Sequence, residues 1–187
     1  MTENVYLQRF IEATKKVGSE VVEFDTLEDA AGYIASKSKG RTLIPKTTLT
    51  EKYQLGDLVT KAGGDVFAGN FRDAGYVPDA GVTFCNFAMA DTGTVVLDST
   101  DEEIRLATTL PEIHYVIVDP QKILADNLAA AQPMMTLHSG SDPKFVAYIT
   151  GPSRTADIER VLTIGCHGPR ELHILIVKSV SSDLLEM

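Results

Sequence analysis

A short polar segment near the carboxyl end of the sequence has residue types that suit the binding of a small anion. It reads Thr150-Gly-Pro-Ser-Arg-Thr-Ala-Asp-Ile-Glu-Arg160 and joins a predicted strand to a predicted helix. At such a junction Gly151 allows close backbone approach, and the helix N-terminus offers free N–H groups. Ser153 and Thr155 add hydroxyls, and Arg154 adds a fork of donors. The alternative is structural: Ser153 or Thr155 caps the helix, and Arg154 faces solvent.

A second segment, Gly165-Cys-His-Gly-Pro-Arg-Glu-Leu-His173, places a histidine on a constrained loop. Glycine and proline surround His167, whose imidazole could donate or accept a proton. Its neighbour Cys166 is a possible thiolate, and Gly168 is a candidate ligand-binding residue. The alternative is an ordinary loop histidine beside a packing cysteine. No second pair of ligands follows at the spacing of a zinc site, so we predict no metal.

The third segment is Gly81-Val-Thr-Phe-Cys-Asn-Phe-Ala-Met-Ala-Asp-Thr-Gly-Thr-Val-Val-Leu97. Asp91 could act as a general base or, as a carboxylate, as a nucleophile. The three residues that follow are candidates for ligand binding, because small side chains let a ligand come close; they are Thr92, Gly93 and Thr94. The alternative is a hairpin turn in which Asp91 accepts hydrogen bonds from the turn's own amides.

Composition excludes several classes of function. The 187 residues carry a formal net charge of −9, which argues against nucleic acid as a partner. Two cysteines, Cys85 and Cys166, are too few for a four-thiolate iron–sulfur or zinc site. The sequence contains no nucleotide-binding or serine-hydrolase signature, so we predict no cofactor. His114 and His138 have no other candidate functional residue beside them, and we predict no role for either. With no signal peptide and no apolar run long enough to span a membrane, we expect a cytoplasmic protein.

The elements that must position these segments alternate between helix and strand. The patterns predict helices at about residues 2–16, 26–36, 48–62, 120–131 and 158–164. They predict strands at 20–24, 41–44, 65–67, 94–97, 113–118, 145–150 and 172–177, with loops at 68–81 and 132–144. This alternation is typical of an α/β fold with a largely parallel sheet. We therefore expect one domain over residues 1–187, with a frayed tail at 178–187.

Taken together, the three segments resemble the LUD domain family of the lactate-utilization protein C type. Residues 81–97 resemble the family's central motif, and residues 150–159 and 165–173 resemble its C-terminal pair of motifs. The resemblance covers roughly residues 37–177 and is weaker over residues 1–36. It implies a Rossmann-like three-layer α/β/α sandwich, similar to the sugar-phosphate isomerase and CoA-transferase superfamily.

The resemblance also implies a role in the bacterial oxidation of L-lactate to pyruvate, beside separate iron–sulfur subunits. In such systems this component carries no known redox centre, which agrees with the two cysteines. The sequence departs from the family pattern at two places. Asp91 stands where the family often has glutamate, and the N-terminal part is shorter than in the lactate subunits.

Two kinds of function follow, and we favour the first. It is a non-redox subunit or accessory protein of an iron–sulfur system that oxidises L-lactate. The alternative is a stand-alone enzyme or sensor for a small anionic ligand, such as a sugar phosphate, a CoA ester or a hydroxy acid. In that alternative Ser153, Arg154 and Thr155 hold the anion, while Asp91 or His167 moves protons. The sequence does not decide whether the protein catalyses a reaction.

Overall fold

The computed structural model describes residues 5–74, 78–155, 163–164 and 167–187. Six parallel strands form its central sheet. In order across the sheet the strands are β1 (Glu20–Phe24), β12 (Glu171–Val177), β7 (Ile113–Val118), β4 (Ala80–Phe84), β2 (Arg41–Leu43) and β3 (Asp65–Val66). The inner strands β12, β7 and β4 are buried along almost their whole length. Such continuous apolar runs are typical of a parallel sheet covered on both faces, so the predicted sheet is confirmed.

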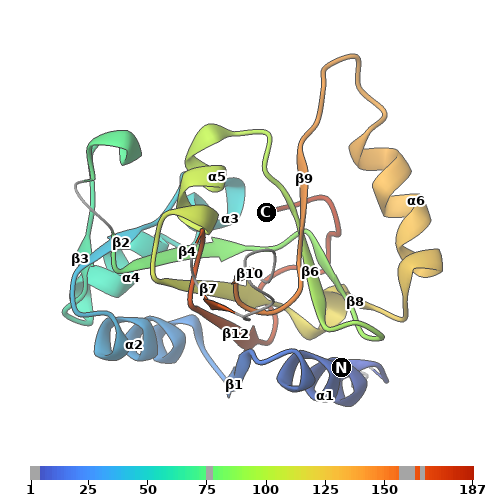
Figure 1. Ribbon diagram of the computed structural model, residues 1–187, viewed down its shortest axis with the longest axis horizontal. Helices are drawn as coiled ribbons and strands as arrows, with labels where there is room; N and C mark the ends of the chain where they lie inside the picture. Colours follow the sequence, from blue (N-terminus) through green and yellow to red (C-terminus); the bar gives the residue numbers. More distant parts are fainter. Residues whose placement is uncertain (1–4, 75–77, 156–162, 165–166) are drawn as a thin grey trace.

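Helices flank this sheet (Figure 1). In that view α1 (Leu7–Lys16) and α2 (Leu27–Lys37) run along its lower side, and α3 (Thr48–Lys52) and α5 (Glu102–Thr109) along its upper side. The remaining helix of this group, α4 (Leu55–Lys61), packs against α2. The predicted α/β class is therefore confirmed. Within the described ranges, none of the helices has the length and apolar character needed to cross a membrane.

A second, four-stranded sheet was not predicted. Its strands, in order, are β8 (Ile123–Leu124), β5 (Phe87–Met89), β6 (Thr94–Asp98) and β9 (Val146–Ile149). β5 and β6 form an antiparallel hairpin, and β9 pairs with β6. Helix α6 (Asn127–Leu137) covers part of this sheet through Ala130, which packs in one cluster with Phe87, Met89 and Val96. The short pair β10 (Arg154–Thr155) and β11 (Thr163–Ile164) is antiparallel.

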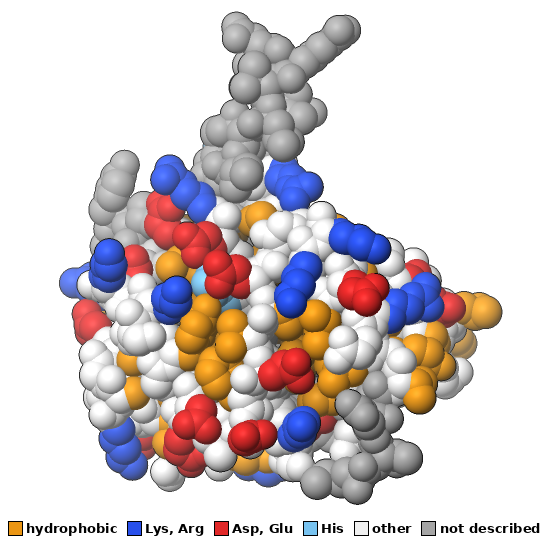
Figure 2. Space-filling model, turned by 90° about the horizontal axis from the view of Figure 1, so that it is seen from below, with side chains coloured by type: hydrophobic (Ala, Val, Ile, Leu, Met, Phe, Trp, Pro, Cys, Tyr) orange, Lys and Arg blue, Asp and Glu red, His pale blue; other side chains and the backbone are white. Residues whose placement is uncertain are grey.

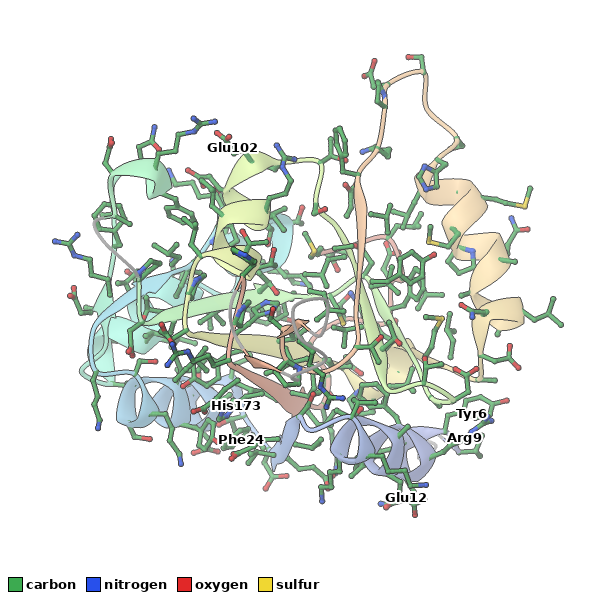
Figure 3. The ribbon with its side chains drawn as sticks, viewed as in Figure 1. Tyr6, Arg9, Glu12, Phe24, Glu102 and His173 are labelled. Carbon is green, nitrogen blue, oxygen red and sulfur yellow. The ribbon has the colours of Figure 1, made fainter. Side chains whose placement is uncertain are left out.

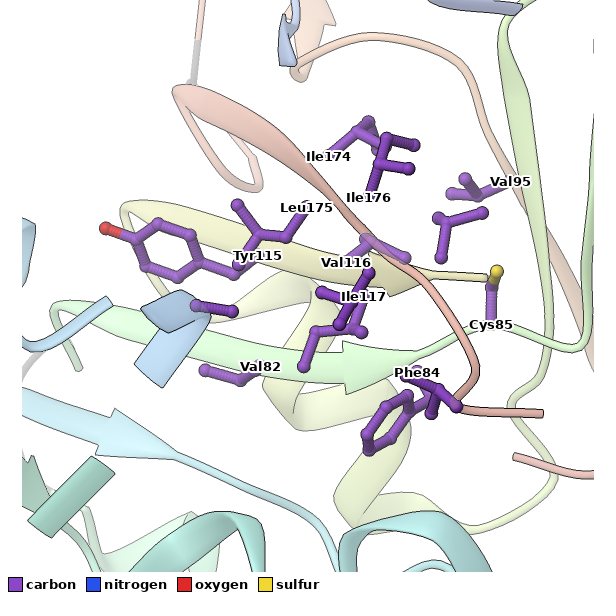
Figure 4. Close-up of a cluster of buried hydrophobic side chains, with 14 of the residues drawn as sticks. Val82, Phe84, Cys85, Val95, Tyr115, Val116, Ile117, Ile174, Leu175 and Ile176 are labelled. Carbon is purple, nitrogen blue, oxygen red and sulfur yellow. The ribbon is translucent and has the colours of Figure 1, made fainter. Parts of the chain in front are cut away.

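The core lies where side chains of β4, β7 and β12 meet the helices and the second sheet (Figure 4). Val82, Tyr115, Val116, Ile174 and Leu175 are each completely buried. Branched side chains from three adjacent strands leave little freedom to repack. The sheet is therefore a rigid base for the loops at its edges.

The structure corrects the helix predicted at 120–131 and the loop predicted at 132–144. Pro120–Lys122 is a single 3-10 turn that leads into β8, and α6 runs from Asn127 to Leu137. The physical reason is capping: Asp126 accepts a hydrogen bond from the amide of Ala129 and so starts the helix there.

Three further boundaries differ from the prediction. The helix predicted at 48–62 is split into α3 and α4 at Gln54, whose φ of 48° lies in the left-handed region. Strand β4 begins at Ala80, inside the predicted loop. The helix predicted at 158–164 is wrong at Thr163–Ile164, which form β11, while residues 156–162 lie outside the described residues.

The tail is also different, because residues 180–187 lie across the carboxyl edge of the central sheet. We call these residues the C-terminal strap. Its first amide, that of Val180, donates to Asp119 Oδ2 at 2.7 Å, just after β7. At its other end, the Met187 carbonyl accepts a hydrogen bond from the amide of Leu49 at 3.2 Å. The expected fraying is wrong because the strap satisfies polar groups of the sheet edge.

Candidate functional site

Asp91, Thr92 and Gly93 form the turn between β5 and β6, which is the hairpin of the structural alternative. The hydrogen bonds expected from the turn's amides do not reach Asp91 Oδ1, which is buried without a partner among the described residues. Gly93 has a φ of +66°, a conformation that other residues rarely adopt. A Cβ added there would lie 2.5 Å from the backbone nitrogen of Thr14 in α1. The hairpin tip is therefore pressed directly against the backbone of α1.

A chain of hydroxyl groups links this turn to the segment that begins at Thr150. Thr92 Oγ1 lies 2.7 Å from Thr94 Oγ1, which in turn lies 2.7 Å from Thr150 Oγ1 at the end of β9. The next residue, Gly151, has a φ of +77°, and a Cβ there would lie 2.6 Å from the Val17 carbonyl oxygen. Two motifs that are far apart in the sequence thus meet at the carboxyl end of α1.

Arg154 has a structural partner at this place. Its guanidinium donates a hydrogen bond to the carbonyl of Val17, the residue that ends α1. A cation at this position also complements the negative end of the helix dipole. Arg154 and Thr155 form β10, in which the backbone of Thr155 pairs with Thr163, and the start of the helix predicted at 158–164 lies outside the described residues. The helix N-terminus of the sequence-based anion cradle therefore stays a prediction, whereas Arg154 itself is engaged with the end of α1.

The loop that carries His167 packs on the same segment. Ser153 Oγ donates to the His167 carbonyl at 3.0 Å, and the Ser153 amide donates to the Pro169 carbonyl at 2.9 Å. The Gly168 backbone passes so close that an added Cβ would lie 3.2 Å from Ser153 Cβ. The side chain of His167 itself is exposed. Cys166 lies outside the described residues.

These segments border a hollow of about 270 Å³ between β9, the end of α5 and the His167 loop. Three of the hydroxyls that line it donate their protons to backbone carbonyls: Thr108 and Thr109 to Arg105, and Ser153 to His167. Thr150 Oγ1 is paired with Thr94 Oγ1, and the half-exposed Tyr148 also lines the hollow. Among the described residues that line it there is no lysine or arginine. The described lining therefore offers an anion no lysine or arginine, only hydroxyl groups, backbone groups and two histidines.

His114, which stands alone in the sequence and had no predicted role, lies in the wall of this hollow. Its side chain on β7 is 1% exposed, and its Nε2 lies 2.9 Å from Thr83 Oγ1. Burial disfavours the charged imidazolium and lowers the pKa of His114 to about 3. The ring is therefore neutral at physiological pH. A histidine inside the apolar run 113–118 was the available signal.

Asp91 faces a different hollow, of about 500 Å³, between the hairpin tip and α1. Arg9 and Glu12 border the same space, and Figure 3 shows both on α1. In the part of the chain that the structure describes, Asp91 Oδ1 is buried without a hydrogen-bond partner. Thr150 borders both hollows, but His167 borders only the first. The two candidate proton-transfer residues thus line separate spaces.

A buried cation lies under the C-terminal strap, where the sequence analysis placed no site. Lys122 is 2% exposed, and its ammonium donates to the carbonyls of Glu186, at 2.6 Å, and Cys85, at 3.3 Å. Burial lowers the pKa of Lys122, since desolvation disfavours its charged form. Burial likewise raises the pKa of the Cys85 thiol to about 12, which makes it an unreactive neutral group.

Two further buried polar side chains accompany Lys122 at this edge. Asn86 Nδ2 donates to the Leu185 carbonyl at 2.9 Å, and its Oδ1 accepts from the amide of Asp98. Asp119, which is 4% exposed, accepts two strap amides on Oδ2. The signal that the sequence offered was their position: Asp119 directly follows β7, and Asn86 is the second residue after β4. Polar residues at the carboxyl ends of parallel strands are typical of ligand sites.

Charges of both signs are interspersed over the face seen in Figure 2, with apolar side chains between them. Interspersed charges give no single-signed field over this face. Across the described ranges, no three His, Cys, Asp or Glu side chains gather as metal ligands would.

The chain is similar to a known protein family and to named relatives in it. The family model of the LUD domain matches residues 7–177. "Lactate utilization protein C" of Bacillus subtilis (strain 168) is 31% identical over 179 residues, which cover 87% of this chain and 74% of that protein. The protein of the same name from Bacillus licheniformis is 31% identical over 88% of this chain and 75% of its own length.

A solved structure shares the fold. The crystal structure of a DUF162 family protein from Deinococcus radiodurans has a TM-score of 0.66 and 19% sequence identity. The match covers 95% of this chain and 99% of that one. At this identity the likeness extends to the fold alone.

Replacing Gly93 with alanine should destabilise the protein by about 2 kcal/mol or more, because the new Cβ meets the α1 backbone and disfavours the required φ. Urea unfolding measures the change. Gly63→Ala is the matched control, since Gly63 also has a positive φ but nothing lies within 4 Å of an added Cβ. Equal losses in the two variants would contradict the packing of the hairpin tip against α1.

Stability should fall as the pH falls from 7 to 5, and His114 should contribute about 2 kcal/mol of that fall. Its folded pKa of about 3 lies below the ordinary value of 6.5, so the unfolded state binds the proton first. Urea unfolding at both pH values should show a smaller fall in His114→Gln. The exposed His138→Gln should behave as the wild type. An unchanged slope in His114→Gln would show that His114 is not held neutral.

Proposed function

This chain belongs to the LUD domain family, and from that premise we propose that it acts in lactate utilization as a non-redox component beside iron–sulfur partner subunits. The observation that carries the proposal is the match to lactate utilization protein C over most of both chains. The cysteine content supports it, because two cysteines are fewer than a four-thiolate cluster needs. Oxidation of L-lactate to pyruvate is the reaction of the whole system in this proposal, and the cytoplasm is its place.

The surface of α6 supports the part of the proposal that concerns partners. Leu128 is 84% exposed and Met135 is 69% exposed, and the two lie seven residues apart on one face of the helix. The sequence from Asn127 to Ser141 contains no charged residue, although the chain as a whole carries a charge of −9. An uncharged, apolar helix face on an acidic protein is typical of a protein-binding surface. We assign it to the iron–sulfur partner.

The alternative function is a stand-alone enzyme or sensor for a small ligand. The hollow beside His167 and His114 favours it, because its 270 Å³ would hold a molecule of a few non-hydrogen atoms. Binding of a small acid by this chain is compatible with both functions, since a component of the lactate system could also sense its substrate. Gene deletion and co-purification experiments distinguish the two functions.

Deletion of this chain should slow growth on L-lactate as the only carbon source and leave growth on glucose unchanged. Growth slows because, without this chain, the proposed lactate-oxidising system lacks one of its components. Growth curves of the deletion strain, with and without the chain restored on a plasmid, measure this. Unchanged growth on L-lactate would contradict the proposed role.

An affinity-tagged chain should co-purify with iron–sulfur proteins from cells grown on L-lactate. With the double variant Leu128→Glu, Met135→Glu, the amount of co-purified iron–sulfur protein should fall at least tenfold. Two carboxylates on the apolar face would have to be desolvated at the interface. Iron content and mass spectrometry of the purified material report the partner. Leu110→Glu is the control, because Leu110 is 42% exposed at the end of α5. No iron–sulfur protein with the wild type would contradict the partner assignment.

A further inference from the structure

The C-terminal strap lies where parallel α/β sheets bind their ligands. Chains leaving the carboxyl ends of β2 and β4, which are neighbours, go in opposite directions: β2 leads outward to β3, and β4 leads across to β7. Ligands in open α/β sheets bind at such a switch point, outside the carboxyl ends of the strands. Here the strap crosses from the end of β12, past β7, to Asn86 after β4 and Leu49 after β2.

The strap supplies the hydrogen-bond partners that a ligand would supply. The ammonium of Lys122 and the amide nitrogen of Asn86 both donate to strap carbonyls, those of Glu186 and Leu185. In the opposite sense, Asp119 Oδ2 accepts the amides of Val180 and Ser181, at 2.7 and 3.2 Å. Two donors and one acceptor on the sheet edge are therefore paired with peptide groups of the strap.

We propose that the strap covers a binding site for a small 2-hydroxycarboxylate. When the strap is displaced, this ligand binds to Lys122, Asn86 and Asp119 in place of the strap's peptide groups. The ligand's carboxylate would accept hydrogen bonds from Lys122 and Asn86, and its hydroxyl would donate to Asp119. Each buried polar group thus keeps a partner after the exchange, which a simple carboxylate could not provide for Asp119. The choice of a hydroxy acid rests on the proposed function, whereas the position of the site rests on the contacts of the strap.

Charge also favours the exchange. Two acidic side chains of the strap, Asp183 and Glu186, lie close enough to stabilise the ammonium of Lys122 electrostatically. When the strap leaves, these charges leave with it, and the buried cation lacks compensation except from Asp119. An anionic ligand restores that compensation. The same logic excludes a neutral ligand, which would leave Lys122 without a counter-charge.

The strap is held in a way that permits displacement. Within its described residues, Val180 and Met187 are the buried hydrophobic side chains, and Leu185 is 43% exposed. A hollow of about 210 Å³ lies at its base, lined by Tyr53 and Val180 among others. The Tyr53 hydroxyl donates a hydrogen bond to the Val180 carbonyl at 2.5 Å. Loss of that one bond loosens the strap without changing Lys122, Asn86 or Asp119.

Isothermal titration calorimetry with L-lactate and with propionate, which lacks the hydroxyl, tests the proposal on the full chain. L-lactate should bind the wild type at least tenfold more tightly than propionate, because propionate leaves Asp119 Oδ2 without a donor, while Oδ1 keeps the amide of Gln121. Tyr53→Phe should bind L-lactate roughly fivefold more tightly than the wild type, since the site must open before the ligand enters. Equal affinity for the two acids would overturn the hydroxy-acid assignment.

Substitutions within the site give the decisive comparison. Lys122→Met should lose at least tenfold in L-lactate affinity, and Lys178→Met, which removes an exposed lysine just before the strap, should bind as the wild type. If Lys122→Met does not fold, Asn86→Asp replaces it: it keeps the acceptor for the Asp98 amide but loses the donor and adds a repelling charge. L-lactate binding that survives both substitutions, or no binding to Tyr53→Phe, would overturn the site.

The outcome is separate from that of the proposed function. A deletion strain that grows normally on L-lactate, together with binding that depends on Lys122, would contradict the cellular role and keep the site. A deletion strain that fails on L-lactate, together with a purified chain that binds no hydroxy acid, would keep the role and overturn the site.

Discussion

The buried ammonium of Lys122 is the constraint on which the carboxyl edge of the sheet depends. A buried cation costs several kcal/mol unless neighbouring groups satisfy it, and here its donors reach the carbonyls of Cys85 and Glu186. Cys85 directly follows β4, and Glu186 belongs to the C-terminal strap. The strap must therefore fold back over the sheet for the charge to be accommodated. Asp119 and Asn86 fix the rest of its path.

The three segments with chemically suggestive residues share a second role, which is to position α1. Gly93 packs on the backbone of α1, and Gly151 and Arg154 both contact the carbonyl of Val17 at its end. Ser153 then ties this point to the His167 loop. Much of what resembles an anion cradle in the sequence is thus the joint between one helix, one hairpin and one loop.

The sequence predicted the parts of the fold that depend on local pattern. Strands such as 113–118 are continuous apolar runs bounded by Pro111 and Pro120, and their parallel pairing follows from the alternation with helices. The second sheet was missed because β5 and β8 are only three and two residues long. Lys122 was missed because its segment has a helix-like start at Pro120. No local pattern shows that a distant tail will cover a lysine, since that contact joins residues 64 positions apart.

Amide hydrogen exchange at Val180 and Ser181 tests the central claim most directly, because both amides donate to Asp119 across the carboxyl edge of the sheet. In the free protein we expect both to be strongly protected, and saturation with L-lactate should make both exchange faster as the strap is displaced. Amides that exchange at the rate of an unstructured chain in the free protein would contradict the strap. Protection that stays the same or increases with L-lactate bound would contradict its displacement.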